Sequence, residues 1–338
     1  MKRDDVTSGA ERLSALVRSF EGRRVMVLGD LVADQFLYGE IARVSREAPV
    51  LILRHERTET VPGGAANCVM NLATLGARAS IVGAVGDDAA GRALLERLSA
   101  AGVDCGGVVV SKDLRTTTKA RVLAGHAHSP RQQVIRIDYE GAPADETLRS
   151  ELAARARAAA AKAEAFVVSD YNYGAAAGEA LNVLREEAGP KHVLVDSRFR
   201  LLEFGGFTSA TPNEDEVEQV AGRRLAGAAE LENEGERLRR RLGYRSLLIT
   251  RGKHGMLLVE DGAEPLHIGA VGSSDAVDVT GAGDTVIAAY ALALASGSTF
   301  RDAAHIANHA GGLVVMKRGT ACVTRRELLA SLGGEDEP

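Results

Sequence analysis

The chain has 338 residues, with 41 Lys and Arg against 46 Asp and Glu, so its formal net charge is −5 at pH 7. Hydrophobic residues make up 45% of the sequence and charged residues 26%, an ordinary globular composition that excludes a largely disordered chain. The acidic excess argues against a nucleic-acid-binding surface, because neutralising phosphates requires clustered Lys and Arg.

The cysteines and the apolar segments indicate where the protein works. Cys68, Cys105 and Cys322 are scattered and show no paired spacing, which predicts neither a disulfide framework nor a cysteine-based zinc site. Residues 1–24 lack the apolar core of a secretory signal, and the longest apolar stretch, near 286–295, is far shorter than the roughly 20 residues that cross a bilayer. We therefore expect a cytoplasmic protein that does not bind membranes.

Short apolar runs alternate with helical patterns along most of the chain. We predict strands over residues 25–30, 79–85, 166–170, 192–196 and 246–250, and helices over residues 67–75, 89–101 and 152–165. Buried strands separated by helices are typical of βαβ units, so the predicted class is α/β, with a mostly parallel central sheet covered on both faces. Three of the strands end in Asp, at the edge where such sheets bind ligands.

Two segments, 49–55 and 116–138, have strand patterns without intervening helices. They predict a small antiparallel flap that projects from the main sheet. The sequence shows no repeat and no linker, so we expect a single domain over residues 1–338, with lid segments at approximately 35–58 and 112–140. His126 and His128 lie in a polar stretch and are interpreted as part of a solvated loop rather than as metal ligands.

The clearest local signal is the octapeptide Asp-Val-Thr-Gly-Ala-Gly-Asp-Thr at 278–285, which precedes a helical run. Gly281 and Gly283 let the backbone approach a ligand, and the free N–H groups at the start of a helix suit a phosphoryl group in transfer. Asp284 could accept the proton of an attacking hydroxyl. The alternative is a glycine turn with an acidic residue that complements the helix dipole.

Other motifs fit a sugar and a nucleotide. Gly63, Gly64 and Asn67 lead into a helix, and Asp34 follows the first strand, where these groups could hold sugar hydroxyls; a simple turn and cap is the alternative. Asn213 and Glu216 could organise Mg²⁺ through its waters, or could cap an acidic first turn. A glycine-spaced loop at 250–256 could hold a nucleotide phosphate.

Several common chemistries are not supported. The sequence contains no G-x-x-x-x-G-K-[ST] phosphate loop, no H-E-x-x-H zinc motif and no G-x-S-x-G nucleophile elbow. An NAD(P)-dependent oxidoreductase would suit the parallel sheet, but no G-x-G-x-x-G pattern follows the first strand.

Three of the motifs occur in the order found in one family. From Val25 to about Leu329 the chain resembles the ribokinase/PfkB carbohydrate kinases, on the basis of Gly63 to Asn67, Asn213 to Glu216 and Asp278 to Asp284. The resemblance implies a ribokinase-like three-layer α/β/α fold with a small β-lid that excludes water. It implies transfer of the γ-phosphoryl group of ATP to a sugar hydroxyl, and a homodimer that forms through the lid.

The resemblance also implies roles for individual residues. Asp284 would be the catalytic base, and the anion hole would be formed by the backbone of Gly281, Ala282 and Gly283. The sugar would be bound by Asp34, Gly63, Gly64 and Asn67. The nucleotide would be bound by Asn213, Glu216, Thr250, Gly252, Gly255 and Asn308, with Glu216 acting through Mg²⁺. By the same analogy, Asp278 and Thr280 would help to bind a monovalent cation such as K⁺.

Within the family, the likeness is greatest to kinases of D-glycero-β-D-manno-heptose 7-phosphate, whose product is heptose 1,7-bisphosphate. It is carried by residues 29–39, 43–50, 62–67, 117–121, 133–138 and 308–320. Such a kinase forms half of a bifunctional protein; the H-x-G-H pattern of the nucleotidyltransferase half does not occur here, so we expect a kinase alone. Cations available for the acceptor's phosphate are Arg43, Lys119, Arg121, Arg136 and Arg198, with Lys119 and Arg136 counted among the predicted substrate-binding residues.

Two departures from the subgroup leave the acceptor open. Tyr173 stands where the subgroup has Lys, and Ser197 and Arg198 stand where it has Pro and Lys. Arg and Lys bind anions with different geometry. A kinase for another sugar, sugar phosphate or nucleoside is therefore the first alternative. A non-catalytic regulator that binds a sugar or a nucleotide is the second.

Overall fold

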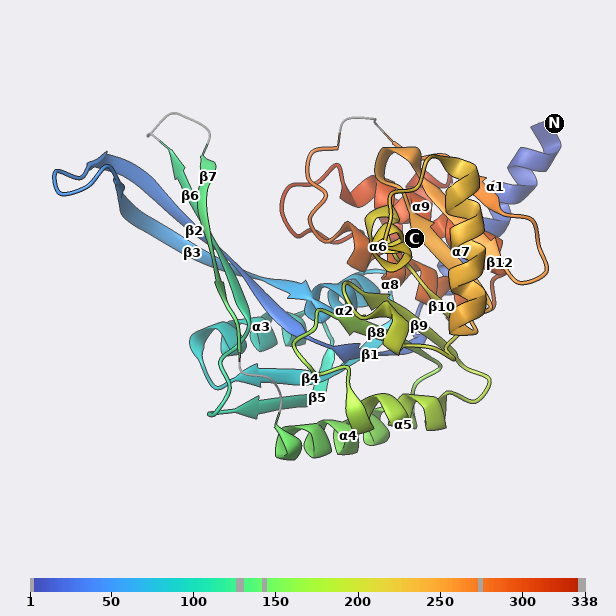
Figure 1. Cartoon of the computed structure of the whole chain (residues 1–338), viewed down its shortest axis with the longest axis horizontal. Helices are drawn as coiled ribbons and strands as arrows, with labels where there is room; N and C mark the ends of the chain where they lie inside the picture. Colours follow the sequence, from blue (N-terminus) through green and yellow to red (C-terminus); the bar gives the residue numbers. More distant parts are fainter. Residues whose placement is uncertain (1–2, 126–130, 142–144, 273–275, 334–338) are drawn as a thin grey trace.

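The computed structural model describes residues 3–125, 131–141, 145–272 and 276–333, so His126 and His128 lie outside the described residues. A nine-stranded sheet forms the body of the molecule (Figure 1). Its order is β13 (Leu266–Ile268), β12 (Met256–Glu260), β11 (Ser246–Thr250), β10 (Ser209–Ala210), β9 (His192–Ser197), β8 (Ala165–Asp170), β1 (Arg24–Gly29), β4 (Arg78–Gly86) and β5 (Asp104–Ser111). All neighbours pair in parallel except β11 with β12 and β12 with β13, which confirms the predicted mostly parallel sheet.

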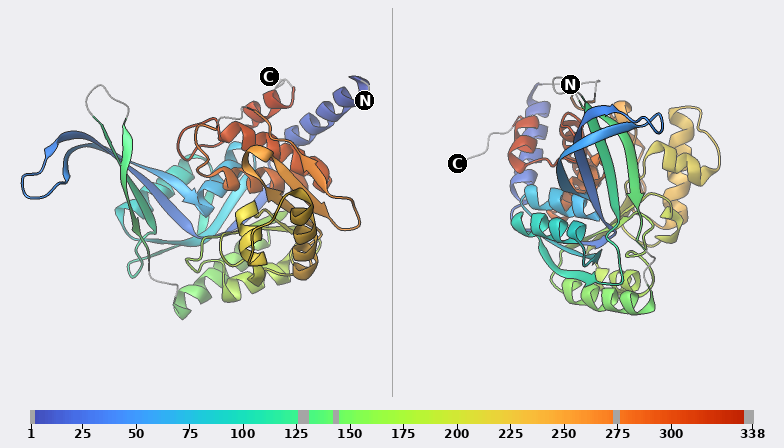
Figure 2. Two further views of the ribbon diagram at one scale, coloured as in Figure 1. Left: turned by 45° about the horizontal axis from the view of Figure 1, so that its top comes forward. Right: turned by 90° about the vertical axis from the view of Figure 1, so that its left-hand side faces the viewer.

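Helices cover both faces of this sheet (Figures 1 and 2). One core contains side chains of α1 (Arg3–Arg18), α2 (Ala65–Thr74), α3 (Ala89–Ala100), α8 (Ala282–Ala295), α9 (Phe300–Val314) and α10 (Arg325–Ser331). The other contains side chains of α4 (Glu146–Ala160), α5 (Gly178–Ala188), α6 (Glu214–Ala221) and α7 (Ala228–Leu242). Along β1, Val25 and Val27 join the first core while Met26 and Leu28 join the second, because successive strand side chains point to opposite faces. None of the helices in the described ranges is long and apolar enough to cross a membrane.

The predicted helix over 152–165 was misplaced. Helix α4 begins at Glu146, where the Asp145 side chain caps it by accepting from the N–H of Leu148 at 2.8 Å. It ends at Ala160, and Ala165 is already the first residue of β8. The alanine-rich composition extends the helix propensity past this end, but the apolar run that starts at Ala165 is buried as a central strand.

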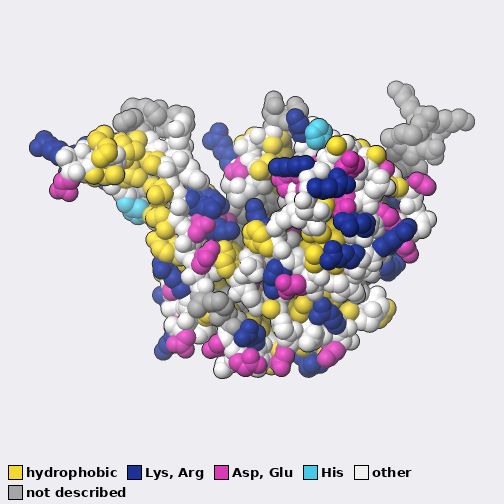
Figure 3. Space-filling view, viewed as in Figure 1, with side chains coloured by type: hydrophobic (Ala, Val, Ile, Leu, Met, Phe, Trp, Pro, Cys, Tyr) yellow, Lys and Arg dark blue, Asp and Glu magenta, His cyan; other side chains and the backbone are white. Residues whose placement is uncertain are grey.

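The second sheet projects from the body, and Figure 3 shows a hollow between the two. Its order is β3 (Leu51–Gly64), β2 (Leu31–Val44), β6 (Thr118–Gly125) and β7 (Gln132–Tyr139). The prediction of an antiparallel flap was only partly right, because the central pair, β2 and β6, is parallel. Strand β2 follows β1 and strand β6 follows β5, and both leave the body in the same direction. The chain then returns beside β2 as β3 and beside β6 as β7.

Candidate active site

Asp284 lies in the first turn of α8, beyond the carboxyl ends of the central strands. Gly281, the residue before this helix, has a φ of 75°, a left-handed conformation that favours glycine. The Asp284 carboxylate accepts from Asn67 Nδ2 at 2.8 Å and from the Tyr171 hydroxyl at 3.0 Å. The motif therefore places a carboxylate beside the free N–H groups that open a helix.

The environment of Asp284 changes its acidity. The residue is only 3% exposed, and burial raises its pKa from the ordinary 3.8 to about 7, although the hydrogen bonds from Asn67 and Tyr171 act to lower it. A base works best when its pKa is near the working pH, because it is then free to accept a proton and strong enough to hold it. Burial and a raised pKa are what a general base at this position requires, and the catalytic role of Asp284 stays a prediction.

The predicted sugar-binding residues meet at the root of the small sheet. Asp34 is buried in β2, forms an ion pair with Arg121 and accepts from the Thr320 hydroxyl at 3.3 Å. A β-carbon placed on Gly63 would lie 2.5 Å from Asp34 Oδ2, so any side chain there would displace the Asp34 carboxylate. Lys119 pairs with Asp34 in the β2–β6 register. Asp34 and Lys119 lie close enough to Asp284 to act on its charge, and Asn67 donates to it directly.

The two predicted phosphate-binding cations have different surroundings. Lys119 is half-buried, its Nζ lies 5.6 Å from the centre of the Tyr171 ring, and burial lowers its pKa. Arg136 lies on the outer strand β7, where its Nε donates to Asp138 at 2.8 Å. Arg136 is exposed and already paired, whereas Lys119 faces the site.

Four of the six predicted nucleotide-binding residues line one cavity, and Asn213 and Glu216 lie outside its lining. Thr250, Gly252, Gly255 and Asn308 all line a largely apolar space of about 200 Å³. Ala282 and Gly283, from the start of α8, also line it. Asn308 is held in place because its Nδ2 donates to the carbonyl of Gly269 at 2.7 Å. The cavity therefore connects the glycine-spaced loop after β11 to the helix that carries Asp284.

Asn213 and Glu216 form a reciprocal cap of α6. Asn213 Oδ1 accepts from the Glu216 N–H at 2.8 Å, and Glu216 Oε2 accepts from the Asn213 N–H at 2.9 Å. Burial raises the pKa of Glu216, although its hydrogen bonds with Asn213 act to lower it. Because Asp196 lies in the same electrostatic neighbourhood, oxygen donors of the kind that Mg²⁺ prefers are present. In the part of the chain that the structure describes, however, no three His, Cys, Asp or Glu side chains form a closed metal cage.

The residues predicted to help bind a monovalent cation organise the loop before α8. Asp278 accepts from the N–H of Thr280 at 2.9 Å through one carboxylate oxygen, and from the N–H of Gly319 at 2.9 Å through the other. Asp278 thus ties the loop to the segment after α9. Its role toward a cation stays a prediction.

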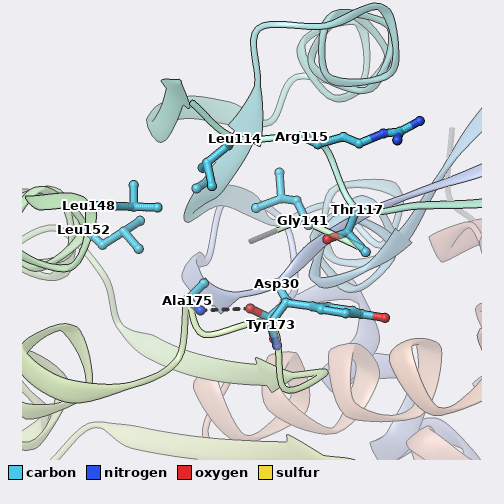
Figure 4. Close-up of a pocket in the computed structure, with 11 residues that line it drawn as sticks. Asp30, Leu114, Arg115, Thr117, Gly141, Leu148, Leu152, Tyr173 and Ala175 are labelled. Carbon is cyan, nitrogen blue, oxygen red and sulfur yellow. Dashed lines mark hydrogen bonds between the residues drawn. The ribbon is translucent and has the colours of Figure 1, made fainter. Parts of the chain in front are cut away.

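Sequence reasoning singled out Tyr173 in the turn after β8, but it did not single out Tyr171. Asp30, at the end of β1, accepts from the backbone N–H groups of Tyr171, Tyr173 and Ala175 at 2.8–3.0 Å, so the turn wraps around a buried carboxylate. Figure 4 shows Asp30, Tyr173 and Ala175 around a cavity of about 40 Å³, too small for a sugar phosphate. The sequence feature that pointed to this region was the Asp at the end of each of three strands. Nothing in the sequence indicated that this turn places the Tyr171 hydroxyl next to Asp284.

Tyr171→Phe is expected to shift the pH dependence of catalysis. The hydroxyl of Tyr171 lowers the pKa of Asp284, so its removal raises that pKa and leaves less of the base ionised near neutrality. We expect the rise of kcat/KM with pH, centred at about 7 in the wild type, to move to higher pH, with the loss recovered in alkaline solution. Tyr173→Phe is the matched control, and an unchanged profile for Tyr171→Phe would contradict the assignment.

Comparison with known proteins identifies the relatives of this chain. Residues 23–325 match the pfkB family carbohydrate kinases. The chain is 39% identical over 324 residues to the bifunctional protein HldE of Gluconobacter oxydans, covering 94% of this chain and 66% of that protein. It is 40% identical over 313 residues to HldE of Pseudomonas aeruginosa, covering 91% and 63%. The chain thus spans about two thirds of the length of these curated relatives.

Solved structures share the fold at low sequence identity. Arabidopsis thaliana ribokinase, complexed with ribose and ATP, has a TM-score of 0.71 at 20% identity, covering 92% of this chain and 99% of that one. Phosphofructokinase-2 from Escherichia coli has a TM-score of 0.73 at 19% identity, covering 92% and 98%. This likeness confirms the predicted ribokinase-like fold, and the family match confirms the predicted enzyme class. The chain belongs to the pfkB family of carbohydrate kinases.

Proposed function

We propose that this protein transfers the γ-phosphoryl group of ATP to D-glycero-β-D-manno-heptose 7-phosphate and produces heptose 1,7-bisphosphate. The observation that carries the proposed chemistry is the buried Asp284, beside the free N–H groups of α8 and between the sugar-side residues and the nucleotide cavity. The choice of acceptor rests on the resemblance of several stretches to heptose 7-phosphate kinases and on the 39–40% identity to HldE.

In the proposed reaction, Asp284 accepts the proton of the acceptor hydroxyl while that oxygen attacks the γ-phosphorus. The bond between the γ-phosphorus and the β,γ-bridging oxygen breaks, and ADP leaves. The N–H groups of Gly281, Ala282 and Gly283 would stabilise the charge on the transferred group. Asp34, Gly63, Gly64 and Asn67 would hold the sugar, and Lys119 the acceptor's own phosphate. Mg²⁺ would neutralise phosphate charge, with Glu216 orienting its waters.

The small sheet would act as a lid within a single catalytic domain. Its root carries Asp34, Gly63 and Lys119, so its strands reach the acceptor directly. We also propose that it mediates a homodimer in the cytoplasm. Figure 3 shows hydrophobic side chains gathered on its surface. The exposed ones are Val44, Val50, Leu51, Val134, Ile135 and Ile137. A sheet that exposes such a patch in solution is typical of a protein–protein contact.

The proposal is tested by ADP release from MgATP across a panel of acceptors. The panel contains the heptose 7-phosphate, ribose, fructose, fructose 6-phosphate and adenosine. Turnover on the heptose phosphate alone is the expected result. Turnover on another acceptor alone would contradict the proposed acceptor but would support the proposed phosphoryl transfer. If no acceptor gives ADP release although the protein binds ATP, the result would favour a non-catalytic regulator.

Glu216→Gln is expected to raise the Mg²⁺ concentration for half-maximal activity by about 10-fold, the usual cost of losing a group that orients metal-bound waters. Asp215→Asn, in the same helical turn but exposed, is the matched control. The melting temperature of each variant reports any loss of the α6 cap. An unchanged metal titration would remove Glu216 from this role.

A further inference from the structure

Arg198 is an exposed cation at the carboxyl end of β9. Within the described chain its guanidinium forms no hydrogen bond or ion pair. The neighbouring Arg200, by contrast, forms an ion pair with the buried Asp170. A guanidinium carries five donors in a planar fork that suits a phosphoryl group. An unpaired one at the carboxyl end of a central strand is therefore available to a ligand.

The backbone around Arg198 is fastened to the end of β8. The Arg198 N–H donates to the carbonyl of Asp170 at 3.2 Å, and the Ser197 hydroxyl donates to Asp170 Oδ2 at 2.7 Å. The Arg200 N–H donates back to Ser197 Oγ at 3.1 Å. These bonds fix the start of the Arg198 side chain relative to Asp170.

Asp170, which holds the backbone of Arg198, is also close in sequence to a residue that contacts Asp284. Tyr171 is the next residue along the chain from Asp170, and its hydroxyl donates to Asp284 at 3.0 Å. Asp170 therefore connects Arg198 and Asp284 through a short run of hydrogen-bonded residues. It does not touch the reacting atoms, so its role is one of positioning.

The neighbours of Arg198 identify the side of the site that it serves. Arg198 and Glu216 line one cavity of about 340 Å³. The charge of Arg198 acts on Asp196, Glu216 and Lys119, and the charge of Lys119 acts on Asp284. A β-carbon placed on Gly283 would lie 3.8 Å from Asp196 Oδ2, and Gly283 also lines the nucleotide cavity. Arg198 thus lies beside Glu216, a predicted nucleotide-binding residue, while Lys119 lies in register with Asp34, a predicted sugar-binding residue.

We propose that Arg198 binds the γ-phosphoryl group of ATP during transfer, rather than the phosphate of the acceptor, and that Asp170 and Ser197 position it. This rests on the proposed function. Asp284 and Glu216 lie close enough to Asp196 to act on its charge, so a cation beside these carboxyl groups would reduce the repulsion that an incoming γ-phosphoryl group meets. Arg198 keeps its proton throughout; the proton released by the hydroxyl goes to Asp284, and ADP carries away the electrons of the broken bond.

The test compares two nucleotides in the full chain. Binding of AMP-PNP, which has a γ-phosphoryl group, and of ADP, which has none, is measured by calorimetry with Mg²⁺. We expect Arg198→Gln to weaken AMP-PNP binding about 10-fold, the loss of one charge-assisted contact, and to leave ADP binding unchanged. We expect kcat to fall about 100-fold with little change in the acceptor KM. Arg198→Lys should recover part of both losses, and the exposed Arg326→Gln is the matched control.

Other outcomes would overturn the proposal. Unchanged binding of both nucleotides, with a raised KM for a phosphorylated acceptor, would assign Arg198 to the acceptor's phosphate. Equal weakening of AMP-PNP and ADP would assign it to the inner phosphates. Ser197→Ala removes one anchor and keeps the buried Asp170–Arg200 pair, so it should reduce the preference for AMP-PNP severalfold; full retention would remove the positioning role. If the wild type phosphorylates no acceptor, the proposed function fails, while the nucleotide comparison still reports on Arg198.

Discussion

Asp284→Asn is expected to bind ATP and sugar normally but to lose turnover by about 1000-fold, within the usual range for removing a general base. The amide is nearly isosteric with the carboxylate and can still accept from Asn67, so the geometry of the site is preserved. What is lost is the ability to take the proton of the attacking hydroxyl. Single-turnover ADP release and calorimetric binding of the two substrates, measured on the same preparation, provide the check.

The stability of this variant is informative. Burial raises the pKa of Asp284 above the value of an unfolded Asp, so ionising the group in the folded protein destabilises the fold at neutral pH. The neutral amide removes that cost, and Asp284→Asn should melt no lower than the wild type at pH 8. Near-normal turnover in a correctly folded variant would exclude Asp284 as the base.

Gly281→Ala is expected to lower kcat by about 100-fold or more, the cost of losing one donor to the developing charge. The new β-carbon would lie 2.5 Å from Asn67 Nδ2, so the amide that binds Asp284 must move, and the start of α8 shifts with it. The measurement is kcat together with the melting temperature.

Gly297→Ala is the matched control for this change. Gly297 also has a positive φ, 87°, but has no atom within 4 Å of the position of a β-carbon, and it lies just beyond the other end of α8. Both substitutions introduce left-handed strain of about 1 kcal/mol, but only the one at Gly281 disturbs the site. Equal loss of activity in the two variants would show that the strain, rather than the clash with Asn67, is responsible.

Much of the fold could be predicted from the sequence because its strands are buried on both faces. The apolar runs at 25–30, 166–170 and 192–196 coincide with β1, β8 and β9 to within about a residue, since a central strand has no polar face to confuse the pattern. The glycine-spaced loop at 250–256 and Asn308 were grouped as nucleotide-binding residues, and they line one cavity.

The remaining features depend on contacts between distant segments. The parallel pairing of β2 with β6 joins strands that lie about 85 residues apart, which no local pattern encodes. Tyr171 reaches Asp284 only because Asp30 fixes the turn after β8. The anchoring of Arg198 requires a buried Asp170, whereas from the sequence that residue is only one of three acids that end a strand.

The continuous strands of the small sheet make it a lever. Asp34 is the fourth residue of β2, and Val44, its last residue, is about 33 Å away at the rise of an extended strand. A tilt of about 10° at the root would therefore carry the tip through about 6 Å. Gly63, on the neighbouring strand, contacts Asp34 with no side chain between them, so the root has little slack. Small movements of the groups around a bound sugar would therefore produce a large movement of the tip of the small sheet. Conversely, a contact that holds the tip in place would restrict the groups that bind the sugar.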